Sequence, residues 1–195
     1  CNIRTGDDNI AINIGNFPSS DIRISHCTFG YGHGLSIGSY TTGGLDSLTV
    51  DSCTFNGTTS GIRMKTNRDR GGVVKNLSYS HIIMTGVKDP VYLSSYYPHE
   101  PDSPAIDPAR AVTATTPVWK NIPLSNISVT GARQAMIIWG LPEQAIENVN
   151  LTSIDIAAEK GMLIYNASGV VFNHCSVTAK SGDLVKQYNA DVSGF

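Results

Sequence analysis

Residues 48–55 read LTVDSCTF and residues 22–29 read IRISHCTF, and both segments place apolar side chains at offsets 0, 2, 5 and 7. Four further segments repeat this spacing. The six units begin at Ile22, Leu48, Leu77, Ile122, Val149 and Val170. Within a unit each apolar pair is separated by two residues, as in a β-strand. The extra residue between the pairs indicates a bend that keeps both pairs facing inward.

A second short strand pattern follows most units. Its apolar members are Leu35/Ile37, Ile62/Met64, Tyr92/Leu93, Ala135/Ile137 and Met162/Ile164. The units start 21 to 29 residues apart, with one exception of 45, and show no helical period. This repeat length predicts an all-β fold, a right-handed parallel β-helix whose coils stack about 4.8 Å apart. A leucine-rich repeat is excluded because its Leu-x-x-Leu-x-Leu pattern is absent. We expect a single domain over residues 1–195.

The spacing of 45 residues marks an insertion at about residues 94–118. This segment contains Pro98, Pro101, Pro104, Pro108 and Pro117. Proline has no backbone N–H to donate to a strand ladder, so the segment is predicted to leave the stack as a loop. It is a candidate wall for a binding cleft, although the sequence does not give its direction.

Composition and charge exclude several classes of protein. The chain of 195 residues has a formal net charge of −2 and no run of Lys or Arg, so we expect no nucleic-acid partner. No stretch of about 20 apolar residues predicts a membrane span. Three cysteines, Cys27, Cys53 and Cys175, share one register position, which predicts a buried stack of small apolar side chains. No Cys-x-x-Cys spacing suggests a metal site.

Three polar segments fall at similar places in successive coils. Asp7 and Asp8 precede the strand at Ile10, and His33 precedes the equivalent strand one coil later. Arg63 and Lys65 alternate with apolar residues on the coil after that, so they are predicted to point outward into solvent. Stacking should bring His33 within several ångströms of the acids, with the two cations one rung further.

This combination of side chains suits the cleavage of a glycosidic bond. Two neighbouring carboxyl groups can divide the roles of acid for the leaving oxygen and base for water. Two outward cations can hold a substrate carboxylate, and Arg can do so through two hydrogen bonds. The glycines beside His33 would let a sugar approach the backbone. Each feature alone is common in turns and on strand surfaces, and only their shared register favours a functional site.

The segments TGDDNIAI (residues 5–12), GHGLSIGS (residues 32–39) and RMKT (residues 63–66) resemble motifs of the polygalacturonases, glycoside hydrolase family 28. The Gly-His-Gly segment is the most specific match, and the resemblance extends over most of the chain through the repeat. It implies an enzyme that hydrolyses the α-1,4-galacturonan of pectin by a single, inverting displacement. It implies no cofactor or metal, no nucleic-acid or membrane partner, a monomer, and a secreted or periplasmic location.

The resemblance also assigns roles to residues. It makes Asp7 the general acid and Asp8 a base that helps to position water. His33 would support the site, and Arg63 and Lys65 would bind galacturonate on the leaving-group side. A further tyrosine of the family matches Tyr97 best, although Tyr92 and Tyr96 are close in sequence.

Two departures from the family pattern matter. An Asn-Thr-Asp motif that supplies a third acid one coil earlier is absent, so we expect an N-terminally truncated β-helix with an open first coil and little hydrolytic activity of its own. Met64 replaces the usual Ile, a volume-conserving change. The alternatives are a rhamnogalacturonan or xylogalacturonan hydrolase, a pectate lyase, or a non-catalytic carbohydrate-binding β-helix. Whether cleavage is endo or exo stays open.

Overall fold

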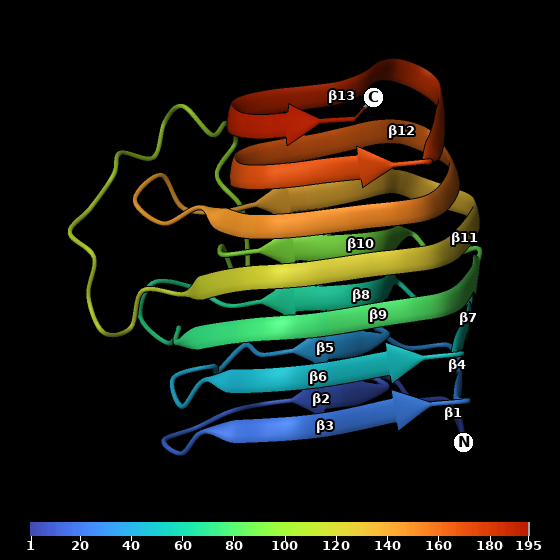
Figure 1. The fold of residues 1–195 in the computed structure, drawn as a ribbon, viewed down its shortest axis with the longest axis horizontal. Coiled ribbons are helices and arrows are strands. Elements are labelled where there is room, and N and C mark those ends of the chain that lie inside the picture. Colours follow the sequence, from blue (N-terminus) through green and yellow to red (C-terminus); the bar gives the residue numbers. More distant parts are fainter. Residues whose placement is uncertain (195) are drawn as a thin grey trace.

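The protein, described by a computed structural model over residues 1–194, is a stack of coils built from thirteen strands (Figure 1). The strands are β1 (Asn2–Ile3), β2 (Ile10–Ile12), β3 (Ser19–Ser25), β4 (Thr28–Gly30), β5 (Leu35–Ile37), β6 (Leu45–Asp51), β7 (Thr54–Asn56), β8 (Ser60–Lys65), β9 (Val73–Thr85), β10 (Asp89–Ser94), β11 (Val118–Trp139), β12 (Ile146–Asn173) and β13 (Ser176–Ser193). The described part of the chain contains no helix that could cross a membrane.

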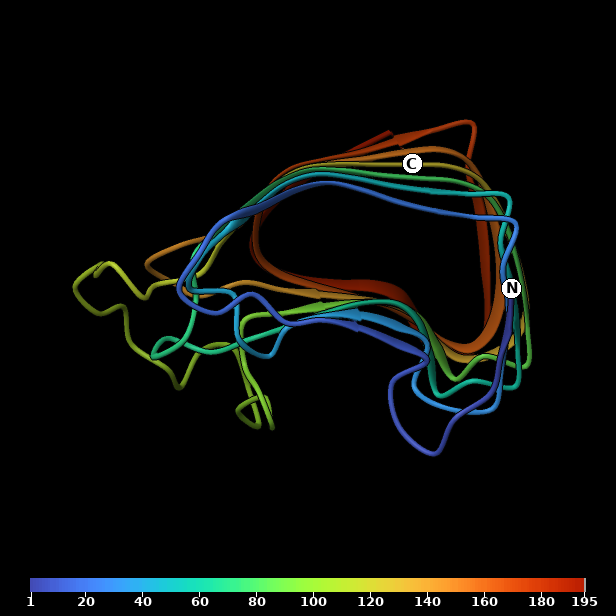
Figure 2. The same ribbon diagram turned by 90° about the horizontal axis from the view of Figure 1, so that it is seen from below.

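Every strand pairing is parallel, and each strand pairs with the equivalent strand of the next coil. Along one side, β2, β5, β8 and β10 pair in order, followed by the last third of β11 and by segments of β12 and β13. We call this side face A. Its inward positions stack in register, as in the series Ile12, Ile37, Met64 and Leu93. The predicted parallel β-helix is therefore confirmed, and Figure 2 shows the coils superposed along the stack.

The bend inside each repeat unit is also confirmed. The residue two positions after the first apolar pair has a positive φ of 51° to 55° in every unit. These residues are His26, Ser52, His81, Asn126, Ser153 and His174. A left-handed residue turns the chain while the side chains before and after it stay inside. As predicted, Cys27 and Cys53 are buried members of the core, and Cys175 packs against it.

The prediction that Ala135 and Ile137 are the inward residues of their strand is wrong by one position. Met136 and Ile138 point into the core with no exposed surface, whereas Ile137 lies on the outward side of face A and is only partly buried. The pairing of Met136 with Met162 and of Ile138 with Ile164 fixes this register. Ala135 and Met136 are adjacent, apolar and both buried. Alternation alone cannot tell which of two adjacent apolar residues points into the core.

Residues 95–117 connect β10 to β11 without a strand and project sideways from the stack (Figures 1 and 2). We call this segment the 95–117 connector. The coils before and after it stay in contact, because Val118 and Trp119 of β11 pair with Val73 and Val74 of β9. The connector therefore leaves the ladder uninterrupted and borders face A at the level of β8 and β10.

Replacing Tyr79 by Phe is expected to raise the free energy of unfolding or leave it within about 1 kcal/mol of the original value. The Tyr79 side chain is fully buried and its hydroxyl has no hydrogen-bond partner; the same burial raises the pKa of the phenol. The substitution removes a desolvated polar group and keeps the ring. Urea unfolding, with Tyr188→Phe on the exposed surface as control, measures it. A clear loss of stability in Tyr79→Phe would contradict this assignment.

Candidate active site

Asp8 is the centre of a compact polar cluster on face A. Its carboxylate accepts hydrogen bonds from Arg63 (Nη1–Oδ1, 3.0 Å) and from Lys65 (Nζ–Oδ2, 2.7 Å). The hydroxyl of Ser36 donates a third bond to Oδ1 at 2.8 Å. Only 9% of the Asp8 side chain is exposed. The structure thus brings together, within hydrogen-bonding distance, an acid and two cations that are more than 50 residues apart in sequence.

The two cations reach Asp8 across an intervening coil. Arg63 pairs in register with Ser36 of β5, and Ser36 pairs with Ala11 of β2. Since serine is short, the long Arg63 side chain can extend along the stack over it. Gly38 follows β5 on the same middle coil. A Cβ at Gly38 would lie 2.0 Å from the backbone oxygen of Lys65, so no side chain fits between these coils at that point. Small residues on the middle coil therefore make the contact possible.

Lys65 is buried, contrary to the prediction that it faces solvent. Its side chain does point outward from the core, but only 7% of it is exposed. Asp8 covers it on one side, and the Tyr97 ring lies 5.3 Å from its ammonium nitrogen. The cluster itself supplies this cover, which strand alternation cannot reveal. A Lys65→Ala change should therefore lower the stability of the fold.

Asp7 and His33 form a second, open pair beside this cluster. The Asp7 side chain is 88% exposed, and its Oδ1 accepts the backbone N–H of Asp8 at 2.8 Å. His33 Nε2 lies 4.0 Å from the same carboxylate. His33 Nδ1 shares a hydrogen bond of 2.7 Å with the hydroxyl of Thr59, which fixes the ring. The two adjacent acids are thus divided: Asp8 is enclosed by cations, and Asp7 is free to meet a ligand.

A buried asparagine joins the two loops that carry these residues. The Asn9 amide donates to the backbone oxygens of Ile3 and Tyr31, and its Oδ1 accepts the N–H of Gly34 at 2.9 Å. Asn9 is 7% exposed, so these bonds satisfy a group that would otherwise be costly to bury. Sequence reasoning missed Asn9, Ser36 and Thr59, although Asn9 and Ser36 lie within the quoted motifs.

The glycines beside His33 are required for the packing of neighbouring coils, a reason that the sequence did not reveal. A Cβ on Gly32 would lie 2.7 Å from Asn9 and Thr5 oxygens, and one on Gly34 would lie 2.1 Å from the backbone oxygen of Ser60. Both glycines have positive φ, 125° and 78°. The neighbouring coils therefore leave no room for a side chain at either position.

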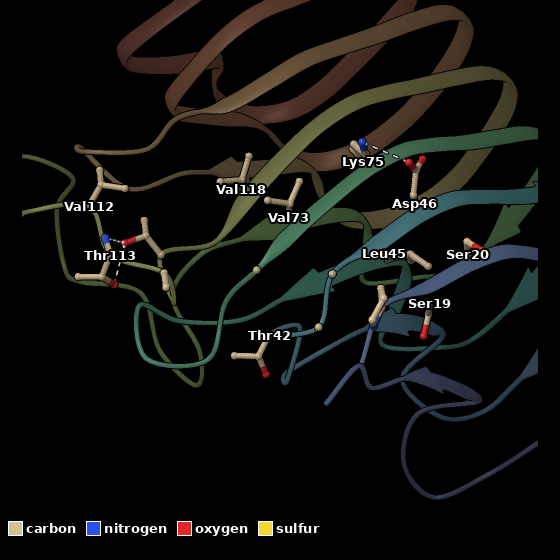
Figure 3. A pocket seen from close by; sticks show the side chains of 16 residues that line it. Ser19, Ser20, Thr42, Leu45, Asp46, Val73, Lys75, Val112, Thr113 and Val118 are labelled. Carbon is tan, nitrogen blue, oxygen red and sulfur yellow. Dashed lines mark hydrogen bonds and ion pairs between the residues drawn. The ribbon is translucent and has the colours of Figure 1, made fainter. Parts of the chain in front are cut away.

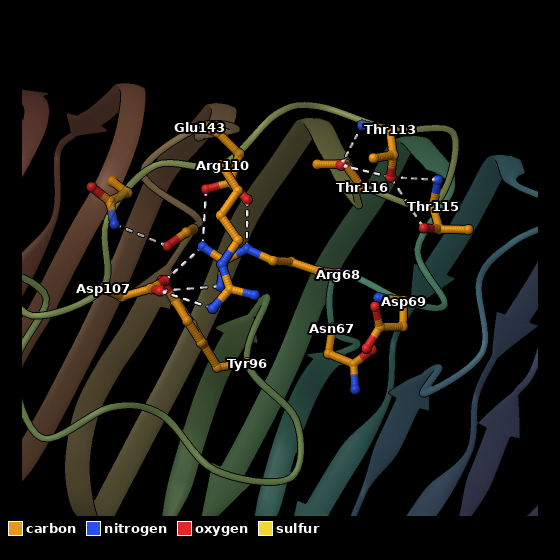
Figure 4. Close-up of polar contacts among 12 residues, drawn as sticks. Asn67, Arg68, Asp69, Tyr96, Asp107, Arg110, Thr113, Thr115, Thr116 and Glu143 are labelled. Atoms are coloured by element: carbon orange, nitrogen blue, oxygen red, sulfur yellow. Dashed lines mark hydrogen bonds and ion pairs between the residues drawn. The ribbon is translucent and has the colours of Figure 1, made fainter.

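A network around Arg68 holds the 95–117 connector next to the site (Figure 4). Arg68 forms ion pairs with Asp107 of the connector (2.6 Å) and with Glu143 of the turn between β11 and β12 (2.5 Å). Burial opposes the ionisation of both carboxyl groups, but the hydrogen bonds from Arg68 prevail and lower the pKa of each. Asn67, next to Arg68, donates to the backbone oxygen of Tyr97 at 3.0 Å.

A pocket of about 720 Å³ lies elsewhere, where Gly43, Gly44 and Gly72 meet residues Val112 to Ala114 of the connector (Figure 3). An ion pair between Lys75 and Asp46 at 3.2 Å lies in its wall. None of the six predicted site residues lines this pocket, and it lacks a free acid pair.

Among residues 1–194, no three His, Cys, Asp or Glu side chains gather as a metal site requires.

Comparison with known proteins connects this geometry to a family. The model of glycosyl hydrolases family 28 matches residues 1–177. The chain is 34% identical over 159 residues to an endo-polygalacturonase of Pectobacterium parmentieri. The aligned region covers 78% of this chain and 36% of that protein. It thus spans about a third of the length of that curated relative.

Solved structures agree on the fold. A family 28 exopolygalacturonase of Yersinia enterocolitica superposes with a TM-score of 0.82 at 19% identity, over 98% of this chain and 35% of that one. A polygalacturonase of Erwinia carotovora gives a TM-score of 0.62 at 28% identity, over 99% of this chain and 42% of that one. By the match over 177 of its 195 residues, the chain belongs to glycosyl hydrolase family 28.

Proposed function

We propose that this chain forms part of the substrate cleft of an enzyme that hydrolyses α-1,4-galacturonan. The observation that carries the proposal is the cluster on face A, in which Arg63 and Lys65 surround Asp8 while Asp7 stays open. A uronate polymer carries one carboxylate on each sugar, so a cationic rung beside two acids fits both its charge and its cleavage. The relatives named as polygalacturonases support the same substrate.

In this proposal each residue has a distinct role. Asp7, exposed and without a Lys or Arg partner, protonates the leaving oxygen. Asp8, held by its three hydrogen bonds, acts as the base that orients water on the reacting carbon. His33, fixed by Thr59, sets the position of Asp7 and contacts the sugar.

Arg63, Lys65 and Tyr97 bind the sugar on the leaving-group side. Arg63 offers its remaining N–H groups to the sugar carboxylate, and the Tyr97 ring beside Lys65 gives the sugar an apolar surface. The cations thus have two tasks, to hold Asp8 and to bind substrate. Their contact with Asp8 sets the distance between the bound sugar and the base.

We also propose where the enzyme acts and in which oligomeric state. Since galacturonan is a polymer of the plant cell wall that does not enter cells, the enzyme acts outside the cytoplasm, as a secreted or periplasmic protein. We further propose that it acts as a monomer, because one chain contributes all six site residues.

The test is hydrolysis of polygalacturonate by the full-length protein, with Asp191→Asn on exposed β13 as a control variant. We expect reducing ends to appear and nuclear magnetic resonance of the first products to show the β-anomer, as inversion at an α-linkage requires. Retained α-configuration would contradict the roles given to Asp7 and Asp8. Ultraviolet absorbance from an unsaturated uronide would identify a lyase, and no cleavage of any pectic polymer would remove the proposed function.

A further inference from the structure

Face A carries two outward columns of side chains that continue past the catalytic cluster. Register places Ser36, Arg63, Tyr92, Ile137, Leu163 and Lys186 in one column. It places Lys65, Ser94, Trp139, Tyr165 and Tyr188 in the other. A polymer bound along the stack must pass over successive members of these columns, so their charges select the sugars that follow the cleavage point.

The rung directly beyond Arg63 and Lys65 holds a carboxylate. Glu100 of the 95–117 connector folds back onto face A, where its Oε1 accepts a hydrogen bond from the Ser94 hydroxyl at 2.8 Å. The Tyr92 hydroxyl donates a second, short bond to the same oxygen. Tyr92 and Ser94 pair in register with Arg63 and Lys65. Glu100 therefore lies about one coil spacing, roughly 4.8 Å along the stack, from the cationic rung.

The partners of Glu100 keep it in place as an acceptor. Burial and the Glu100 carboxylate raise the pKa of the Tyr92 phenol, so Tyr92 keeps its proton and remains a donor. The Tyr92 ring also lies against Arg63, with 5.9 Å between the guanidinium carbon and the ring centroid. Glu100 is partly exposed, so its second oxygen, Oε2, can meet a ligand. It can accept hydrogen bonds from sugar hydroxyls but repels another carboxylate.

Within the two columns, no cation follows the rung of Arg63 and Lys65 until Lys186. In the two columns, all of whose residues the structure describes, the members between the cationic rung and Lys186 are apolar or aromatic apart from Ser94. Arg68 lies over the Tyr96 ring near these residues but is already paired with Asp107 and Glu143. A fully acidic galacturonan would thus bring a second carboxylate to a rung whose charged group is the Glu100 carboxylate.

We infer that Glu100 is a specificity-determining residue that selects an uncharged sugar one position beyond the galacturonate held by Arg63 and Lys65. This inference rests on the proposed function and names its substrate class. The uncharged sugar is a methyl-esterified galacturonate or a neutral sugar such as rhamnose, both of which present hydroxyl donors without a carboxylate. The discrimination comes from repulsion of the wrong substrate rather than from tighter contacts with the right one.

Isothermal titration calorimetry tests the inference without requiring hydrolysis. The chain is titrated with three oligosaccharides of equal length: an acidic oligogalacturonide, a partially methyl-esterified one, and one that alternates rhamnose with galacturonate. Glu100→Gln removes the charge but keeps an oxygen acceptor for Tyr92 and Ser94. Asp102→Asn, an exposed acid of the same connector, is the matched control.

We expect the unmodified chain to bind the acidic oligosaccharide more weakly than at least one of the two less charged oligosaccharides. The relevant ratio is the dissociation constant for the acidic oligosaccharide divided by that for the less charged one. In Glu100→Gln this ratio should fall by about fivefold, as expected for two carboxylates separated by one rung in a solvated cleft. The rhamnose and methyl-ester arms show which uncharged sugar is accepted. An unchanged ratio in Glu100→Gln, an equal fall in Asp102→Asn, or no binding of any of the three would overturn the inference. If Glu100→Gln shifts the ratio but the enzyme does not hydrolyse galacturonan, only the proposed function is contradicted.

Discussion

Replacing Asp8 by Asn is expected to lower the free energy of unfolding by about 3 kcal/mol, whereas replacing Asp7 by Asn should change it by less than about 0.5 kcal/mol. The two residues are adjacent and the substitutions are identical, so the difference comes from their surroundings. Asp8 is 9% exposed and bound to two cations, while Asp7 is 88% exposed. Asn at position 8 leaves the ammonium group of Lys65, only 7% exposed, without its carboxylate partner.

Both substitutions should remove hydrolysis in the full-length protein. We expect each to reduce kcat at least about 100-fold, since a general acid or base typically contributes that much. Thermal unfolding followed by circular dichroism measures the stability of each variant, and reducing-end assays measure turnover. Equal melting temperatures for the two variants would show that the Asp8 cluster does not stabilise the fold. Full turnover in Asp7→Asn would remove Asp7 from the mechanism.

Much of this cluster could be predicted because a solenoid converts sequence spacing into position. Once the offsets of the repeat were recognised, Asp7, His33 and Arg63 had to lie on successive coils of one side. Their proximity follows from strand register and requires no knowledge of side-chain conformation. The core followed in the same way, since nearly every apolar residue of the repeat units is buried.

The burial of Lys65 and the opposite surroundings of Asp7 and Asp8 could not be predicted in this way. Both acids precede β2, outside the regular strand, where alternation does not determine direction. Lys65 does alternate outward, but what covers an outward residue depends on long side chains from other coils and on the 95–117 connector. Periodicity describes the ladder and gives no information about such contacts.

Glu100 shows the same limit more clearly. It belongs to a proline-rich connector with no repeat, and nothing in its neighbours along the chain indicates that it folds back onto Tyr92 and Ser94. The connector was expected to be a wall of a cleft with unknown direction. Its direction is set by the ion pairs of Arg68, whose partners Asp107 and Glu143 are 39 and 75 residues away.

Replacing Arg68 by Ala is expected to release the 95–117 connector and to lower the free energy of unfolding by about 3 kcal/mol. The substitution leaves Glu143, with 4% of its side chain exposed, without a cation, and it leaves Asp107, with 10% exposed, with only the more distant Arg110. It also removes the group that the Tyr96 ring contacts. Tyr97 and Glu100 lie in the same connector, so substrate binding should weaken as well. Arg110→Ala is the matched control, because Arg110 lies 3.7 Å from the same Asp107 but is 63% exposed.

The Arg68 network also predicts a pH dependence. Its carboxyl groups have pKa values below the ordinary 3.8 and 4.5, so the network contributes its full stability above about pH 5 and loses it as the pH falls through the lowered values. The stability difference between the unmodified chain and Arg68→Ala should therefore shrink in acid. Urea unfolding between pH 3 and pH 7 measures it, and hydrogen exchange over residues 95–117 reports release of the connector. A difference independent of pH, or equal exchange in Arg68→Ala and Arg110→Ala, would show that other contacts hold the connector.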